Sequence, residues 1–404
     1  MVYLFLGPIE NDRELSPADA DLSLRGDQIE SASVSSFGVS VAALDDLTTG
    51  GVGLVVGSGR FASEEGTIPA VWILNMADLL NGQSTTESIG GSVSLSDYPR
   101  GGGNDFDEFT RSLDGGDFNG DGVNDVTFTS TYLSTRPNAE NELNGVCIYY
   151  GPMDSDREIT DADFILWNDT DNERWATAIR LTGDINGDGY DDILGSGEEH
   201  SKTFLGFGAA NKNTDQFDPE ILIAGNIVGN PDTSEWEFDY FGRHPEYIGD
   251  RDGDGSDDIA VGASGAGTYQ GSEGATYVFE GLTPGTYSPD DATLTVEGFT
   301  DAQVGTSVAG MGDLFGDGSV ALLVGSRGFD GDHPSERVGA WLYGDATGKV
   351  DVSDALATFS PGDDDESAAL QMVSGDMDGD GLREAVILND DNTLFIVPGA
   401  AFVP

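Results

Sequence analysis

The chain has 404 residues, with 74 acidic and 17 basic side chains that give a formal net charge of −57 at pH 7. So acidic a chain repels nucleic acid, and we expect no nucleic-acid partner. The apolar content of 38% is enough for a folded core, and a single cysteine, Cys147, excludes a disulfide within the chain.

The acidic excess extends beyond any single site. Acidic runs such as residues 363–366 have no spacing suited to metal ligands. Because salt screens repulsion between exposed charges, this composition predicts a protein adapted to high salt. The alternative is an acidic secreted protein in a calcium-rich medium.

The N-terminal part holds two apolar stretches, residues 2–6 and 20–24, which we expect to be the third and fourth strands of a β-repeat. The start has no basic region, and its apolar run is too short for a signal peptide. Either an export signal has been removed, or the chain is a piece of a longer protein. No segment has the composition of a membrane span.

From there the chain repeats one plan, with 63 to 71 residues between the first residues of successive Asp-rich loops. Each unit has a lead-in strand that often carries Phe-Gly, an Asp/Gly loop, a buried strand ending in small residues, a strand with aromatics, and a fourth strand. Residues 259–263, 275–279 and 292–298 are examples of the second, third and fourth strands. A period of this size fits one four-stranded blade plus its loops.

The sequence therefore predicts an all-β protein, a β-propeller of four-stranded antiparallel blades in a single domain over residues 1–404. Six units and a partial N-terminal one are recognisable, which leaves both a six-bladed and a seven-bladed closure open. The approximate units are residues 1–30 (partial), 31–100, 101–170, 171–235, 236–300, 301–362 and 363–404.

The loop between the first two strands of a unit is the main functional motif. Oxygen side chains stand at positions 1, 3, 5 and 9, and glycines at positions 4 and 6 allow a tight turn. Converging carboxylates repel one another unless a cation lies between them, and flexible all-oxygen sites suit Ca²⁺ better than Mg²⁺. An EF-hand would need Glu at position 12, which these loops lack. The four matching loops are residues 117–125, 184–192, 250–258 and 376–384.

Two units depart from this pattern. The loop 313–321 has Phe315 and Ala321 at positions 3 and 9, and the first unit has Thr48 and Leu54 there. We expect no calcium at either loop.

The combination of Phe-Gly lead-in, Asp-rich loop and Gly-Ala-type strand end resembles the FG-GAP repeats of integrin α-subunit propellers, over nearly the whole chain. The resemblance implies about four Ca²⁺ sites, and a ligand face on the opposite side from them. It implies as ligands Asp117, Asn119, Asp121, Val123 and Asp125; Asp184, Asn186, Asp188, Tyr190 and Asp192; Asp250, Asp252, Asp254, Ser256 and Asp258; and Asp376, Asp378, Asp380, Leu382 and Glu384, where the residue at position 7 offers its carbonyl oxygen.

Arginines and aromatics gather in the connections that would form the ligand face, and such side chains suit sugars, acidic glycans or a protein epitope. The alternative is that some of the aromatics fill blade interfaces. The candidate ligand-face residues are Arg60, Tyr98, Arg100, Arg136, Trp175, Trp236, Arg327 and Arg337.

The three histidines lie in different units, and no nucleophile, zinc or phosphate-binding motif occurs. We therefore predict a non-enzymatic, calcium-binding propeller in adhesion or recognition of a cell-surface protein or glycan. It would act on a cell surface, outside the cell or on a virion, as one part of a larger assembly. The alternatives are a propeller-type polysaccharide lyase or hydrolase, and a structural spacer.

Overall fold

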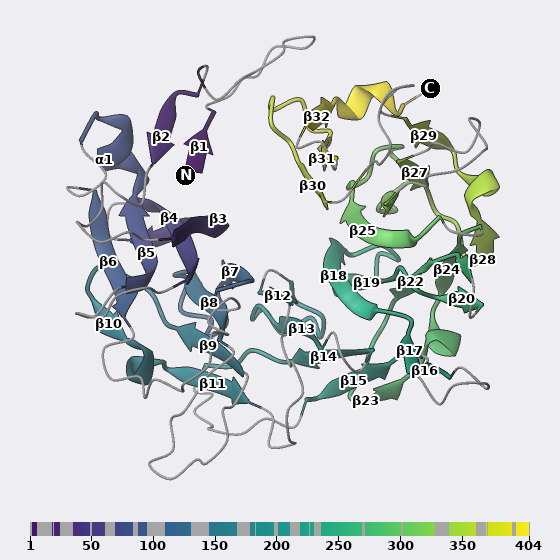
Figure 1. Cartoon of the computed structure of the whole chain (residues 1–404), viewed down its shortest axis with the longest axis horizontal. Coiled ribbons are helices and arrows are strands. Elements are labelled where there is room, and N and C mark those ends of the chain that lie inside the picture. The colour runs from purple at the N-terminus through teal and green to yellow at the C-terminus, as the bar shows by residue number, and fades with distance from the viewer. Residues whose placement is uncertain are drawn as a thin grey trace. The chain divides into compact units, whose positions relative to one another are not determined.

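The computed structural model describes residues 2–5, 18, 20–24, 35–48, 51–60, 69–83, 88–94, 110–130, 145–167, 178–181, 183–197, 201–210, 219–225, 227–229, 236–268, 271–299, 302–327, 339–360, 369, 371–389 and 393–403. Six small, mainly antiparallel sheets follow one another along the chain (Figure 1), and the fold is a six-bladed β-propeller. The prediction of an all-β propeller is confirmed.

The residues fall into two compact units. Unit 1 comprises residues 1–182, 189–193 and 208–218, and unit 2 comprises residues 183–188, 194–207 and 219–404. In chain order, the third sheet is β12-β13-β14-β15-β23.

Unit 1 contains two complete sheets and an N-terminal strand pair. The first sheet has the order β10-β6-β5-β4-β3 and the second β11-β9-β8-β7, and a short helix, α1, follows β5. The elements are β1 (Val2–Leu4), β2 (Leu22–Leu24), β3 (Ser35–Thr48), β4 (Gly51–Arg60), β5 (Pro69–Asn75), α1 (Met76–Leu80), β6 (Ile89–Ser94), β7 (Leu113–Gly116), β8 (Asp125–Ser130), β9 (Gly145–Tyr149), β10 (Arg157–Glu158), β11 (Phe164–Trp167) and β12 (Ala178–Arg180).

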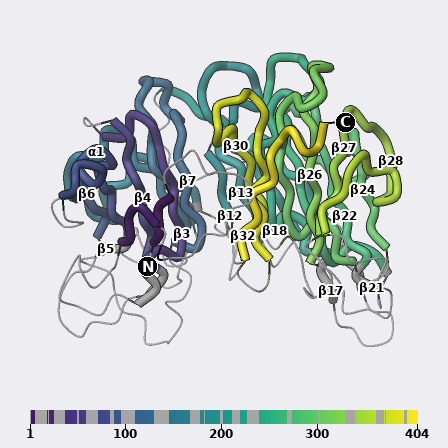
Figure 2. The backbone as a smooth tube through the Cα atoms, turned by 90° about the horizontal axis from the view of Figure 1, so that it is seen from above, coloured from purple at the N-terminus to yellow at the C-terminus, as the bar shows by residue number. Residues whose placement is uncertain are grey.

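Unit 2 contains the sheets β18-β19-β22-β24-β28, β25-β26-β27-β29 and β30-β31-β32, the last two adjacent in Figure 2. Its other strands complete the third sheet or form the short pairs β16-β17 and β20-β21. The strands are β13 (Ile193–Gly197), β14 (Lys202–Gly206), β15 (Ile221–Ala224), β16 (Ile227–Gly229), β17 (Trp236–Phe238), β18 (Phe241–Gly249), β19 (Asp258–Ala263), β20 (Gly267–Thr268), β21 (Gly271–Ser272), β22 (Ala275–Phe279), β23 (Gly285–Tyr287), β24 (Leu294–Glu297), β25 (Val304–Gly310), β26 (Leu322–Ser326), β27 (Ala340–Tyr343), β28 (Gly348–Asp351), β29 (Ala357–Phe359), β30 (Gln371–Gly375), β31 (Glu384–Leu388) and β32 (Leu394–Val397).

Three sheets contain a fifth strand that the sequence did not predict. β10, β23 and β28 come from the connection between the third and fourth strands of a later sheet, and each pairs in parallel with the outer strand of an earlier sheet, β6, β15 or β24. A 3₁₀ turn with a capping box follows each of them, as in Ser288–Asp291, where the Asp291 carboxylate accepts from the Ser288 N–H. The blades are therefore not all four-stranded or wholly antiparallel.

The second strand of a blade is among its most buried elements, because sheets cover it on both faces. β19 and β26 are buried along their whole length and consist mostly of aliphatic residues and glycine. A side chain on Gly262 would collide with the backbone of Gly305 in the next sheet. The small residues at the end of this strand thus permit close contact between successive blades.

The N-terminal strands β1 and β2 pair in antiparallel register, as expected for a third and a fourth strand. Val2 and Leu24 are buried in an apolar cluster with Phe37 and Trp72 of the first sheet. The pair therefore belongs to the core of unit 1.

Candidate metal centre

The loop 250–258 joins β18 to β19, and side-chain-to-backbone hydrogen bonds fix its turn. Asp250 Oδ1 accepts from the N–H groups of Gly253 (2.7 Å) and Asp254 (3.0 Å), and Oδ2 accepts from the Gly255 N–H (3.0 Å). Gly253 and Gly255 have φ of +77° and +97°, a region that favours glycine. The glycines at positions 4 and 6 therefore perform the role predicted for them.

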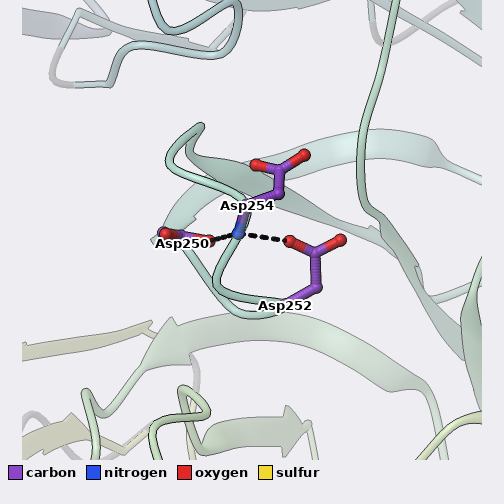
Figure 3. A group of neighbouring side chains, drawn as sticks. All are labelled: Asp250, Asp252 and Asp254. Atoms are coloured by element: carbon purple, nitrogen blue, oxygen red, sulfur yellow. Dashed lines mark hydrogen bonds between the residues drawn. The ribbon is translucent and has the colours of Figure 1, made fainter.

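Three carboxylates converge on this turn (Figure 3). One oxygen from each of Asp250, Asp252 and Asp254 lies within 4.8 Å of the others, and Asp252 and Asp254 are exposed. The Asp254 N–H lies between the first two side chains and donates to both, at 3.0 Å in each case. The predicted ligands at positions 1, 3 and 5 are therefore brought together.

The predicted ligand at position 9, Asp258, is buried beneath the loop. Its Oδ2 accepts from the Arg251 N–H at 2.7 Å, and the whole side chain is buried. Burial raises the pKa of Asp258 to about 7, and the Arg251 N–H opposes that rise. A buried carboxylate close to three others creates a demand for positive charge.

The loop 117–125 in unit 1 has the same internal bonds. Asp117 accepts from the N–H groups of Asp121 (3.0 Å) and Gly122 (2.8 Å), and Asn119 Oδ1 accepts from the Asp121 N–H (2.9 Å). Asp125 is fully buried, and its Oδ1 accepts from the N–H of Gly151 at 2.9 Å. Burial raises the pKa of Asp125 to about 7, and the carboxylates of Asp121 and Asp117 contribute to the rise.

The loop 184–192 is divided between the two units. In unit 2, Asp184 and Asn186 both accept from the Asp188 N–H, at 3.0 Å and 2.9 Å. In unit 1, buried Asp192 accepts from the N–H of Gly208 at 2.8 Å. Each part repeats the bonds of the corresponding part of the other loops.

The loop 376–384 forms a second converging group, in which single oxygens of Asp376, Asp378 and Glu384 lie within 4.8 Å of one another. The Met377 N–H donates to Glu384 Oε2 at 2.6 Å. Because Glu is longer than Asp, Glu384 can accept this hydrogen bond beneath the loop and still lie close to the carboxylates of Asp376 and Asp378. Asp380 accepts from the Leu382 N–H at 2.8 Å and is not part of the group of three.

The two loops predicted to bind no calcium lack acidic side chains at positions 3 and 9. Phe315 packs against the last apolar cluster of unit 2, and Ala321 is fully buried. In the first complete repeat, residues 31–100, the Thr48 hydroxyl donates to the Gly51 carbonyl and Leu54 is a core residue. The absence of metal at these loops stays a prediction.

Two features of these loops were missed from the sequence. Position 8 contacts the preceding loop, through Asp191 in one case and Asp257 in another. Position 2 is apolar in the other loops, but in the loop 250–258 it is Arg251. This side chain is buried, pairs with Glu280, and donates to the carbonyls of Gly344 (2.9 Å) and Ala346 (2.6 Å) in the connection between β27 and β28. The signal in the sequence was an arginine at a repeat position where the other loops have an apolar residue.

The candidate ligand face falls largely outside the described residues, which exclude Tyr98, Arg100, Arg136, Trp175 and Arg337. The backbones of Arg60 and Trp236 end β4 and begin β17, respectively, but their side chains are not among those described. Arg327 follows β26 and is exposed. The grouping of these side chains on one face stays a prediction.

No protein family model matches the chain. Within the described ranges, no helix is long and apolar enough to cross a membrane.

The donor set of the loops fits a hard divalent cation. The side chains that converge in the two groups are all carboxylates, which offer only oxygen donors, and most of them are exposed. Nitrogen or sulfur ligands of the kind that zinc or copper prefers are absent from these two converging groups. The residues present therefore suit an oxygen-preferring divalent cation.

Proposed function

We propose that this protein is a non-enzymatic, calcium-binding propeller of the FG-GAP type that acts in recognition outside the cell. The observation that carries the proposal is the convergence of three carboxylates in each of two loops, at equivalent places in two sheets. Calcium bound there would remove the repulsion between these groups and brace the connection between the first two strands. The loops 117–125 and 184–192 share the same internal bonds and would bind the third and fourth ions.

The exposure of the ligands favours an environment rich in calcium. Asp252 and Asp254 are exposed, so an ion bound there keeps access to water and competes with solvent. Sites of this kind in extracellular modules bind calcium with dissociation constants of about 10⁻⁴ to 10⁻³ M. The net charge of −57 is consistent with a medium whose salt screens the repulsion between exposed carboxylates.

A recognition role is supported by the position of an exposed cation on an acidic protein. Arg327 lies in the connection after β26, where the propeller would present a ligand face. A guanidinium in such a place can bind a carboxylate or sulfate of an acidic glycan or peptide in a bidentate manner. Assays of capture and of polysaccharide cleavage distinguish recognition from the rival functions, which are a polysaccharide lyase or hydrolase and a structural spacer.

The first test is a calcium titration by calorimetry in buffers of high and low KCl, on protein stripped with EDTA. We expect about four ions per chain, weak competition by Mg²⁺, and a higher melting temperature with calcium. The metal proposal fails if folded protein shows neither binding heat nor a change in melting temperature.

The second test is capture on immobilised acidic glycans and cell-envelope proteins, with calcium and with EDTA, combined with an assay for polysaccharide cleavage. Calcium-dependent capture that is weakened by Arg327→Glu supports recognition. Cleavage would favour the enzyme, and a folded, calcium-loaded protein that captures nothing would favour the spacer.

A further inference from the structure

Successive loops of the propeller are joined by the residue at position 8, which was not a predicted ligand. The Asp184 N–H donates to the Asp257 carboxylate at 3.0 Å, and the Asp257 N–H donates to the Asp184 carbonyl at 2.9 Å. Asp257 is residue 8 of the loop 250–258, and Asp184 is residue 1 of the loop before it. Asp257 thus bonds both the N–H and the carbonyl group of Asp184, the first predicted ligand of the preceding loop.

The same bridge occurs one repeat earlier, within unit 1. The Asp117 N–H donates to Asp191 Oδ2 at 2.6 Å, and the Asp191 N–H donates to the Asp117 carbonyl at 3.1 Å. A side chain on Gly116 would collide with the Asp191 carboxylate, so glycine leaves room for the bridge. In the loop 117–125, Asn124 donates through its amide to the Asp45 carbonyl at 2.6 Å.

The remaining two loops have a different residue at position 8. Val320 and Arg383 stand there, and they pack near Gly249 and Gly312, the residues just before position 1 of the preceding loops. Neither side chain carries an oxygen that could accept from a backbone N–H. The carboxylate bridge is therefore restricted to the loops 184–192 and 250–258, both of which carry the full ligand pattern.

We propose that this position-8 bridge couples calcium binding in successive loops, so that an ion in the loop 250–258 strengthens binding in the loop 184–192. The inference rests on the proposed calcium binding. Asp257 lies next to the buried position-9 residue Asp258, and its partner Asp184 uses its own carboxylate to order the turn through Asp188. An ion that fixes the later loop therefore also fixes the backbone of the first ligand in the earlier one.

The test is hydrogen exchange of the peptide covering residues 183–189, in the full chain, with calcium and with EDTA. Asp252→Ala removes a ligand from the later loop only. We expect it to lower calcium-dependent protection of residues 183–189 by about fivefold to tenfold, the lower range of a typical coupling free energy. Asp257→Val should cause a similar loss, and adding Asp252→Ala to Asp257→Val should cause no further loss.

The conservative variant Asp257→Asn separates the bridge from the charge. It removes the negative charge but keeps an oxygen that can accept the Asp184 N–H, and we expect it to retain most of the coupling. Calorimetry on the same proteins keeps the two proposals distinct. If wild type binds no calcium, the proposed function fails; if it binds calcium but Asp252→Ala leaves protection of residues 183–189 unchanged, only the coupling is overturned.

Discussion

Two loops of unit 2, residues 250–258 and 313–321, join the first two strands of successive sheets and share several internal bonds. Asp254 and Asp317 donate their N–H groups to the residue at position 1, each at 3.0 Å. Ser256 and Ser319 donate to the aspartate at position 5, at 2.8 Å and 3.0 Å. Yet only the first loop has a group of three converging carboxylates.

The difference shows that the shape of the loop and its capacity to hold a cation are set by different residues. Positions 1 and 5 and the two glycines make the turn, because their bonds persist where no full ligand set exists. Positions 3 and 9 decide the chemistry: Asp252 and Asp258 in one loop, Phe315 and Ala321 in the other. The loop 313–321 is thus a natural reference for the metal-free turn.

Calcium removal should produce the largest effect and should separate the two loops. At free calcium a hundredfold above its dissociation constant, each bound ion stabilises the fold by about 2.7 kcal/mol, so four ions together contribute about 11 kcal/mol. We expect EDTA to lower the melting temperature and to speed hydrogen exchange in residues 250–258 far more than in residues 313–321. Equal changes in both loops would show that the effect is not local to the ligands.

Replacing Arg251 should have the next largest effect on stability. The equivalent residue in the loop 313–321 is the buried, apolar Leu314. Arg251→Ala leaves Glu280 poorly solvated without its partner, and we expect a loss of about 3–5 kcal/mol of unfolding free energy in urea titrations. The double variant Arg251→Met with Glu280→Gln should lose clearly less. A larger loss in the double variant would contradict this account of the ion pair.

Exchanging positions 3 and 9 between the loops should move a metal site. Asp252→Phe with Asp258→Ala should lower the calcium stoichiometry by one ion, and Phe315→Asp with Ala321→Asp should raise it by one. Because Ala321 is fully buried, the second variant should be about 1–3 kcal/mol less stable in EDTA and recover with calcium. Calorimetry gives the stoichiometry, and an unchanged ion count would show that further residues are needed.

The smallest effect concerns position 5. Asp317→Ala removes the acceptor for the Ser319 N–H, and we expect a loss of about 1 kcal/mol with no change in calcium stoichiometry. Asp254→Ala should cost about the same in EDTA and weaken calcium binding as well. A change in stoichiometry caused by Asp317→Ala would assign a metal to the reference loop.

The spacing of residues in the sequence was sufficient to predict strands and turns within one repeat. The third strand 275–279 has the predicted bounds, and the glycines of the Asp-rich loops have the expected positive φ. Contacts between successive repeats could not be predicted, because they join residues more than 60 positions apart, as in the bridge from Asp184 to Asp257. Their signals were present but local, such as Asn or Asp at position 8 in three loops and the capping boxes that follow β10, β23 and β28.

The parallel fifth strands have a consequence for how the chain emerges from the ribosome. β15 is covered by β23 and β24 by β28, so each of these outer strands is complete only after part of a later blade has been synthesised. Until then the nascent protein exposes an unpaired strand edge, the kind of surface on which chains aggregate. During translation, the high density of negative charge would keep such half-finished chains apart.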